Sequence, residues 1–391
     1  MLSNDALIEI FDSFGNPRSV GRAGEDNLIA ALEHSDRVSR VRIRIKHLEE
    51  LETIVTMMQV PFLVLTSLDI ISSIDTKAPV IPAGFLGGSA PQLQTISLWD
   101  ISFPTLPILL LSTRNLVTLT LHEIPPTGYI SPDAMAVGLA ALTKLEELCI
   151  EFSWVTLRRD KIYPHPVTRI ILPVLKKLTF YGSCTYLDNL VARIDSPQLD
   201  QILISSANQL FEVSTQLIKF LDRSMGPKLT LLRHATIGFS SYHVSFNMYG
   251  LPLSLSRISC DWIDLQVSNL AQSFRHISTT LSNVIHLKIR AVDCGLIYEF
   301  VEGTYDIDWP RLLRQFSAMR SLYASRDLAQ PIALALEDIN TEMVFPFLEL
   351  IYLEGQPVSF IENFFTSRQR SGCPVTVVHT SAEFDQRLRN I

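Results

Sequence analysis

The chain has 391 residues, of which 47% are apolar and only 19% are charged, and its formal net charge is −7. So low a fraction of charged residues is typical of a chain with many short buried strands, and it argues against long disordered tails. The negative charge gives no general attraction for phosphate backbones, so nucleic-acid binding is disfavoured.

The first residues do not have the pattern of a signal peptide, because Asp5 and Glu9 interrupt them and no basic region precedes an apolar block. Residues 13–27 are rich in glycine, with Pro17 among them, and we predict a linker there. No stretch reaches the roughly 18 continuous apolar residues of a membrane helix. We therefore expect a cytoplasmic or nuclear protein with no membrane association.

From residue 28 to residue 391 one pattern recurs: an apolar residue, two of any kind, an apolar residue, one of any kind, and another apolar residue. Successive copies start 23 to 35 residues apart. This count includes a degenerate copy at Leu232, which divides the long interval between Leu199 and Leu255. This spacing is typical of a leucine-rich-repeat solenoid. We predict an α/β fold shaped as a curved horseshoe, with parallel strands on the concave face, helices and loops on the convex face, and capped ends. The other copies start at Val38, Leu65, Leu93, Leu116, Leu145, Leu175, Leu199, Leu255, Val284, Met319 and Leu348.

Segments between the copies must return along the convex side, because parallel strands cannot be joined by hairpins. Apolar residues at helical spacing predict helices in five returns, at 48–59, 132–142, 187–194, 217–221 and 312–316. Ser131 followed by Pro132 and Asp133 is an N-cap pattern. Residues 153–171 and 240–253 are predicted to be irregular insertions.

No known catalytic motif occurs in the chain, and no histidine pair has the spacing of a metal site on a helix. The five cysteines are widely spaced and form no CxxC pair, which favours reduced structural thiols. Cys149 and Cys260 fall within predicted strands, where a cysteine usually serves as a small apolar residue. We therefore expect a non-enzymatic protein with no cofactor and no metal.

The residues that alternate with the repeat's apolar positions point to the opposite side of each strand and should line the concave face. Aromatic and charged residues there are candidates for binding a protein partner. An ordinary solvated sheet face is an equally open interpretation for any single residue. Arg40, Arg42 and Arg44 also share this face, either as a site for an acidic partner or as a charged guard of the sheet edge. The partner-binding candidates are Trp99, His122, Glu147, Glu151, Lys177 and Tyr181.

Residues Leu2 to Phe11 resemble the opening helix of an F-box, with a leucine and turn residue, an acid, and apolar residues ending in Ile-Phe. Residues 84–93, 128–135 and 186–195 are similar to segments of fungal F-box-type leucine-rich-repeat proteins, and the resemblance of the body covers about residues 25–385. It implies a substrate receptor that docks on the adaptor of an SCF-type ubiquitin ligase. Residues 1–12 would then be an F-box-like helix remnant. Its possible adaptor-facing or core positions are Leu2, Leu7, Ile8, Ile10 and Phe11.

The chain departs from the F-box pattern after this segment. The later F-box helices are missing, and Gly15, Asn16 and Pro17 stand where the second helix should be prepared. Two hypotheses follow. The chain is either a protein-binding module of the SCF substrate-receptor kind or an interaction scaffold without ligase coupling.

Overall fold

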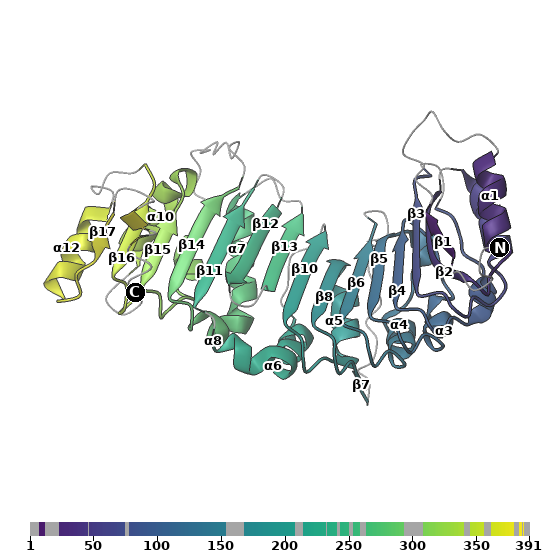
Figure 1. Cartoon of the computed structure of the whole chain (residues 1–391). Coiled ribbons are helices and arrows are strands. Elements are labelled where there is room, and N and C mark those ends of the chain that lie inside the picture. Colours follow the sequence, from purple (N-terminus) through teal and green to yellow (C-terminus); the bar gives the residue numbers. More distant parts are fainter. Residues whose placement is uncertain are drawn as a thin grey trace. The chain divides into compact units, whose positions relative to one another are not determined.

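The computed structural model describes residues 8–11, 23–45, 47–74, 78–153, 168–207, 214–231, 233–240, 243–249, 253–258, 263–292, 308–339, 345–355, 361–378, 383–384 and 386. Residues Met1–Asp200 and Gln201–Ile391 form two compact units. Each unit is an α/β structure built on a sheet whose strands are mostly parallel, as the repeat pattern predicts (Figure 1).

The first unit carries seven strands side by side, every neighbouring pair parallel and in the order β1-β2-β3-β4-β5-β6-β8. A separate parallel pair joins β7 and β9. The strands are β1 (Ile8–Phe11), β2 (Val38–Ile45), β3 (Ser67–Ser72), β4 (Thr95–Trp99), β5 (Thr118–Ile124), β6 (Glu147–Phe152), β7 (Ile170–Ile171), β8 (Lys177–Gly182) and β9 (Ile194–Asp195). The helices are α1 (Ala23–Leu32), α2 (Leu48–Met57), α3 (Leu106–Leu110), α4 (Pro132–Leu139) and α5 (Cys184–Val191), with short 3-10 turns η1 (Phe85–Gly88) and η2 (Pro126–Gly128).

The repeat's apolar residues form the core of this unit. In β3 and β8, buried residues alternate strictly with half-buried ones, and every buried position of the pattern is at most a few per cent exposed. Helices α3, α4 and α5 pack one against the next and follow one another along the sheet (Figure 1). Their buried side chains complete the core, so only the alternate residues of the strands remain available on the other face.

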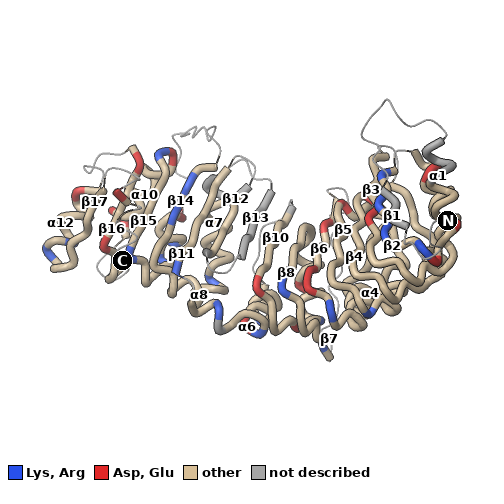
Figure 2. The backbone as a smooth tube through the Cα atoms, in the orientation of Figure 1, with Lys and Arg blue, Asp and Glu red and all other residues tan. Residues whose placement is uncertain are grey.

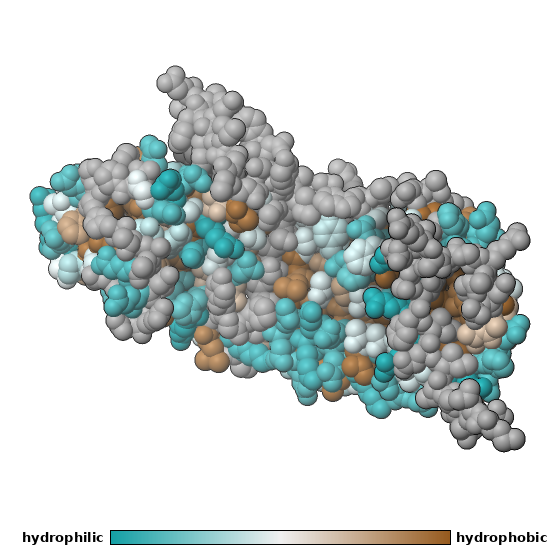
Figure 3. Space-filling view, turned by 45° about the horizontal axis from the view of Figure 1, so that its top comes forward, coloured by the Kyte–Doolittle hydropathy of each residue, from teal (hydrophilic) through white to brown (hydrophobic). Residues whose placement is uncertain are grey.

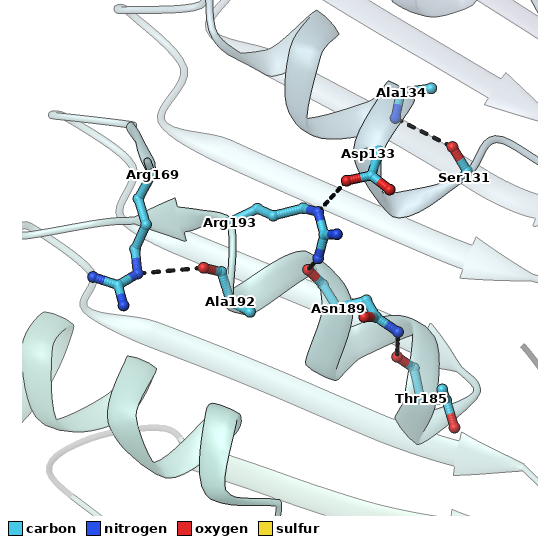
Figure 4. A network of polar contacts seen from close by, with 8 residues as sticks. All are labelled: Ser131, Asp133, Ala134, Arg169, Thr185, Asn189, Ala192 and Arg193. Carbon is cyan, nitrogen blue, oxygen red and sulfur yellow. Dashed lines mark hydrogen bonds and ion pairs between the residues drawn. The ribbon is translucent and has the colours of Figure 1, made fainter. Parts of the chain in front are cut away.

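The predicted cap of α4 is confirmed, because the Ser131 hydroxyl accepts a hydrogen bond from the backbone N–H of Ala134 at 3.2 Å. Asp133, in the first turn of α4, accepts from the buried Arg193 guanidinium, which also donates to the carbonyl of Asn189 at 2.6 Å. Figure 4 shows Arg193 between these two partners, which come from α4 and α5. This network ties two successive helices together.

Two sequence predictions for the N-terminal segment are wrong. Ile8–Phe11 form strand β1 rather than a helix, and they pair in parallel with β2. One short amphipathic helix is only marginally stable alone, whereas the edge of β2 offers a ladder of backbone hydrogen bonds. Residues 23–27 belong to helix α1 rather than to the predicted linker. Residues 1–7 and 12–22, including Leu2 and Leu7, lie outside the described residues.

In the second unit the strands run β10-β13-β12-β11-β14-β15-β16-β17. They are β10 (Gln201–Ala207), β11 (His234–Phe239), β12 (His243–Tyr249), β13 (Leu253–Ile258), β14 (His286–Ala291), β15 (Ser321–Ala324), β16 (Leu350–Leu353) and β17 (Thr376–Val377). The helices are α6 (Thr215–Leu229), α7 (Ile263–Phe274), α8 (Ser278–Leu281), α9 (Trp309–Leu313), α10 (Arg326–Asp338) and α12 (Glu362–Arg370), with the 3-10 turn η4 (Arg275–Ile277).

The spatial order of these strands departs from the order of the sequence. Strand β12 pairs antiparallel with both β11 and β13, so three consecutive strands form a meander that brings β13 back beside β10. The prediction of an irregular insertion at 240–253 is therefore wrong for His243–Tyr249, which form β12. Val244, Phe246 and Met248 are buried in β12, and this alternation is what a half-buried strand requires. Of the other predicted insertion, residues 154–167 lie outside the described residues, and Ile170–Ile171 form β7.

Candidate functional site

The side chains of β4, β5, β6 and β8 that alternate with the buried apolar residues form one face of the first unit's sheet, the polar face. All six predicted partner-binding residues lie on these strands. Trp99 of β4 is aligned with His122 of β5, and Glu151 of β6 is aligned with Tyr181 of β8. These four residues form a row across the ends of the strands, the aromatic–acidic row.

Direct contacts join the members of this row. The Trp99 and His122 rings lie 4.7 Å apart between centroids with a 38° tilt, and Trp99 remains 43% exposed. The Nδ1 atom of His122 lies 2.6 Å from Oε2 of Glu151. An ionised carboxylate only accepts hydrogen bonds, so the imidazole donates from Nδ1. This hydrogen bond holds the pKa of Glu151 below its usual value, against the opposing effect of partial burial.

Glu147 and Lys177 lie apart from the row. They are aligned with each other on β6 and β8, and four positions along β6 separate Glu147 from Glu151, about 13 Å in an extended strand. Figure 2 shows the acidic positions of β5 and β6, with the basic position of β8 beside them. The six predicted residues therefore make two groups on one face rather than one continuous site.

A β-bulge in β5 adds an acidic residue to the row. Leu121 is aligned with Ile150 and Ile124 with Phe152, so His122 and Glu123 together stand opposite the single residue Glu151. Both are half-buried rather than packed in the core. Burial, then the charges of Glu123 and Glu151, raises the pKa of Tyr181 to about 12. The sequence pattern did not indicate Glu123 as a residue of this face, because strict alternation assigns it to the buried side.

The preceding strand repeats this geometry. Asp100 follows β4 with φ 51°, and Glu123 in β5 has φ 52°. Left-handed backbone costs a residue with a side chain roughly 1–2 kcal/mol, and such outliers cluster at functional sites. Asp100 donates its backbone N–H to the carbonyl of His122 at 3.0 Å. Burial and the charge of Glu123 raise the pKa of the Asp100 carboxyl. Two adjacent strands thus end in the same unfavourable backbone conformation and place two carboxylates beside the row.

Cys149 lies on the polar face and is half-buried, as the alternation of buried residues along β6 predicts. Its Sγ lies 3.6 Å from Oε1 of Glu151, and burial together with the Glu151 charge raises the pKa of the thiol to about 12. Ligand atoms of His122, Cys149 and Glu151 all lie within 4.8 Å of one another, the one such group of three found among the described residues. Cys260 lies outside the described residues.

The arginines of β2 share one exposed face, as predicted. Arg40, Arg42 and Arg44 are exposed, and Nε of Arg42 lies 3.0 Å from a carboxylate oxygen of Asp69 on β3. A pocket of about 220 Å³ lies beside these strands, and none of the six partner-binding candidates lines it. Its lining residues are Leu28, Ile29, Ile43, Arg44, His47, Glu49, Glu50, Thr53 and Ile54.

The exposed hydrophobic side chains are scattered in small groups among polar ones on the face that Figure 3 shows. Within the described part of the chain, no helix combines the length and the hydropathy needed to cross a membrane. Of the predicted adaptor positions, Ile8, Ile10 and Phe11 lie in β1, and their role stays a prediction.

Comparison with known proteins finds a likeness in structure and none in sequence. No family model matches the sequence, and no curated protein matches it. Among solved structures, the chain is similar to the leucine-rich repeat-containing protein LegL7 from Legionella pneumophila. The match has 14% sequence identity and a TM-score of 0.31, and it covers 86% of this chain and 99% of that one.

Proposed function

We propose that the chain is a leucine-rich-repeat solenoid that binds a protein partner through the polar face, which lines the concave side in such folds. The observation that carries the proposal is the aromatic–acidic row. It presents an exposed Trp99 ring packed against the tilted ring of His122, with Tyr181 and the carboxylates of Glu123 and Glu151 beside it. Exposed aromatic residues on a rigid sheet are typical anchors of protein interfaces.

The charge around the row indicates what kind of segment it binds. The charge of Glu123 acts on Asp100, and the charges of Glu123 and Glu151 both act on Tyr181. The three carboxylates therefore act on one small area. A partner segment with a lysine or arginine side chain would gain both from these carboxylates and from the aromatic ring of Trp99. We infer that the row recognises a basic segment of a folded or extended protein.

The test begins with proximity labelling to find binding partners, followed by affinity measurements with purified chains. Trp99→Ala and Glu151→Lys should each weaken binding at least tenfold, since central anchors cost more than about 1.4 kcal/mol when removed. Ile108→Ala on α3, 65% exposed, and Glu52→Lys on α2 are matched controls away from the polar face. Equal affinity in all four variants would sink the proposal.

The finer hypothesis, a substrate receptor of an SCF-type ubiquitin ligase, rests on the resemblance of residues 1–12 and of the repeats to F-box proteins. The formation of strand β1 by Ile8–Phe11 favours the alternative, an interaction scaffold without ligase coupling. Co-purification of the full chain with an SCF adaptor distinguishes the two. Stoichiometric adaptor supports the receptor, and its absence from extracts that contain the adaptor supports the scaffold.

A further inference from the structure

Three potential metal ligands converge on the polar face of β5 and β6. Cys149 and Glu151 are two positions apart on β6, so both point to the same side of the strand. The bulge of β5 places His122 against Glu151 from the neighbouring strand, with Nδ1 and Oε2 2.6 Å apart. A thiol, an imidazole and a carboxylate therefore meet within 4.8 Å.

The three side chains are both reachable and held in place. The side chains of His122 and Glu151 are 24% and 29% exposed, and Cys149 is half-buried, so an ion from solvent has access. Strands β5 and β6 are each hydrogen-bonded to a neighbour on both sides, which fixes the backbone positions of the ligands. A site on rigid strands keeps its ligand geometry better than a site on loops.

The charge around the three ligands favours a cation. Asp100, Glu123 and Glu147 add negative charge near the site, and Glu147 acts directly on the Cys149 thiol. Lys177 opposes them, and it is the positive group acting on Cys149. The carboxylates outnumber the lysine, so the local field attracts a divalent ion despite the protonated state of the thiol.

We propose that His122, Cys149 and Glu151 bind a divalent transition-metal ion of the Zn²⁺ class. One sulfur, one nitrogen and one oxygen ligand match the donors that Zn²⁺ takes in proteins, and three protein ligands leave a fourth position for water or for a group of a binding partner. On binding, the Cys149 thiol loses its proton to solvent and the thiolate sulfur coordinates the ion. The imidazole moves its Nδ1 proton to Nε2 by exchange with solvent, and Nδ1 and the carboxylate then exchange their mutual hydrogen bond for bonds to the metal.

This proposal does not depend on the proposed protein partner, because the ion binds to the isolated chain. The experiment uses the full chain after dialysis against a chelator, with Zn²⁺ titrated by calorimetry and Co²⁺ by absorption spectroscopy. We expect one Zn²⁺ per chain, a rise in melting temperature on addition of Zn²⁺, and a near-ultraviolet thiolate-to-Co²⁺ charge-transfer band. Affinity should fall as the pH is lowered, because the proton competes for the thiolate.

Variants identify the ligands. Cys149→Ser should abolish the thiolate band, and His122→Gln and Glu151→Gln should each weaken Zn²⁺ binding by more than the roughly 10–100-fold that loss of a supporting residue costs. Cys373→Ser and His276→Gln change exposed residues outside the cluster and should leave affinity and spectrum unchanged. Circular dichroism checks that each variant folds. No Zn²⁺ uptake by the folded wild-type chain, or uptake that Cys149→Ser leaves intact, would overturn the assignment.

Discussion

The histidine pair of the second unit makes its stability depend on pH in a direction that the structure fixes. His286 of β14 is only 7% exposed, and its Nδ1 lies 2.8 Å from the Ser321 hydroxyl oxygen of β15. The ring of His234 on β11 stacks on it at 4.5 Å. Burial, then the charges of His234 and Arg320, lowers the pKa of His286 to about 4, and burial also lowers the pKa of His234.

The sign follows from the protons bound in each state. Between pH 6.5 and 4 the unfolded chain has a protonated histidine while the folded chain keeps His286 neutral, so the unfolded state binds more protons and stability falls on acidification. With pKa values of 6.5 unfolded and about 4 folded, the loss attributable to His286 is about 2 kcal/mol at pH 5 and about 3 kcal/mol at pH 4, relative to pH 8. His234 adds to it in the same direction.

The assay is denaturant unfolding from pH 8 to pH 4.5, followed by circular dichroism, on the wild type, His286→Gln and His276→Gln. Glutamine is uncharged throughout, so His286→Gln should lose about 2 kcal/mol less than the wild type between pH 8 and pH 5. His276 is exposed, and its variant should follow the wild type. Parallel stability curves for wild type and His286→Gln, or a stability that rises on acidification, would refute the reasoning.

Four further substitutions test the packing and the strained backbone. Gly138→Ala in α4 would place a Cβ 2.9 Å from the Pro107 backbone and should cost about 1–3 kcal/mol, whereas Gly226→Ala in α6 meets nothing within 4 Å and should add about 0.5–1 kcal/mol; thermal melts compare them. Asp133→Ala removes the carboxylate that pairs with Arg193, whose side chain is only 5% exposed. This change should lower the free energy of unfolding in urea by about 1–3 kcal/mol. The loss is smaller than for a fully buried ion pair because the Asp133 side chain is half exposed. Glu123→Gly relieves a left-handed backbone and should raise stability by about 0.5–1 kcal/mol while weakening partner binding; a loss of stability would show that the backbone is unstrained there.

The repeat pattern predicted where the strands lie because its physical basis is local. An apolar residue at every second position must be buried, and each copy of the pattern from Val38 to Leu348 overlaps a strand of the structure, although the copy at Leu255 starts within β13 and runs past the end of that strand. The same alternation correctly assigned the predicted partner-binding residues to the other face of β4, β5, β6 and β8. It did not predict their grouping, because alignment across strands depends on how each return segment sets the register.

The failures have equally physical causes. Residues 240–253 appeared irregular because they are rich in serine, tyrosine, phenylalanine and glycine, yet Val244, Phe246 and Met248 carry the two-residue period that places β12 in the sheet. The pattern of a repeat also assumes that every strand is parallel, so it could not place an antiparallel meander. The helix expected at the N-terminus formed a strand, because pairing with β2 depends on residues that lie far along the chain.

The bulge of β5 explains why the polar face is chemically richest at this one place. In an unbroken strand after Leu119 and Leu121, the next buried position would be Glu123; the chain instead shifts register and buries Ile124 opposite Phe152. The sequence signal was a change of apolar spacing from two residues to three, which also occurs between Leu98 and Ile101 around Asp100. One extra residue, within β5 and directly after β4, thus keeps a carboxylate out of the core. In β5 it also holds His122 against Glu151, so the geometry that serves the proposed recognition of a basic segment is the same geometry that brings the three metal ligands together.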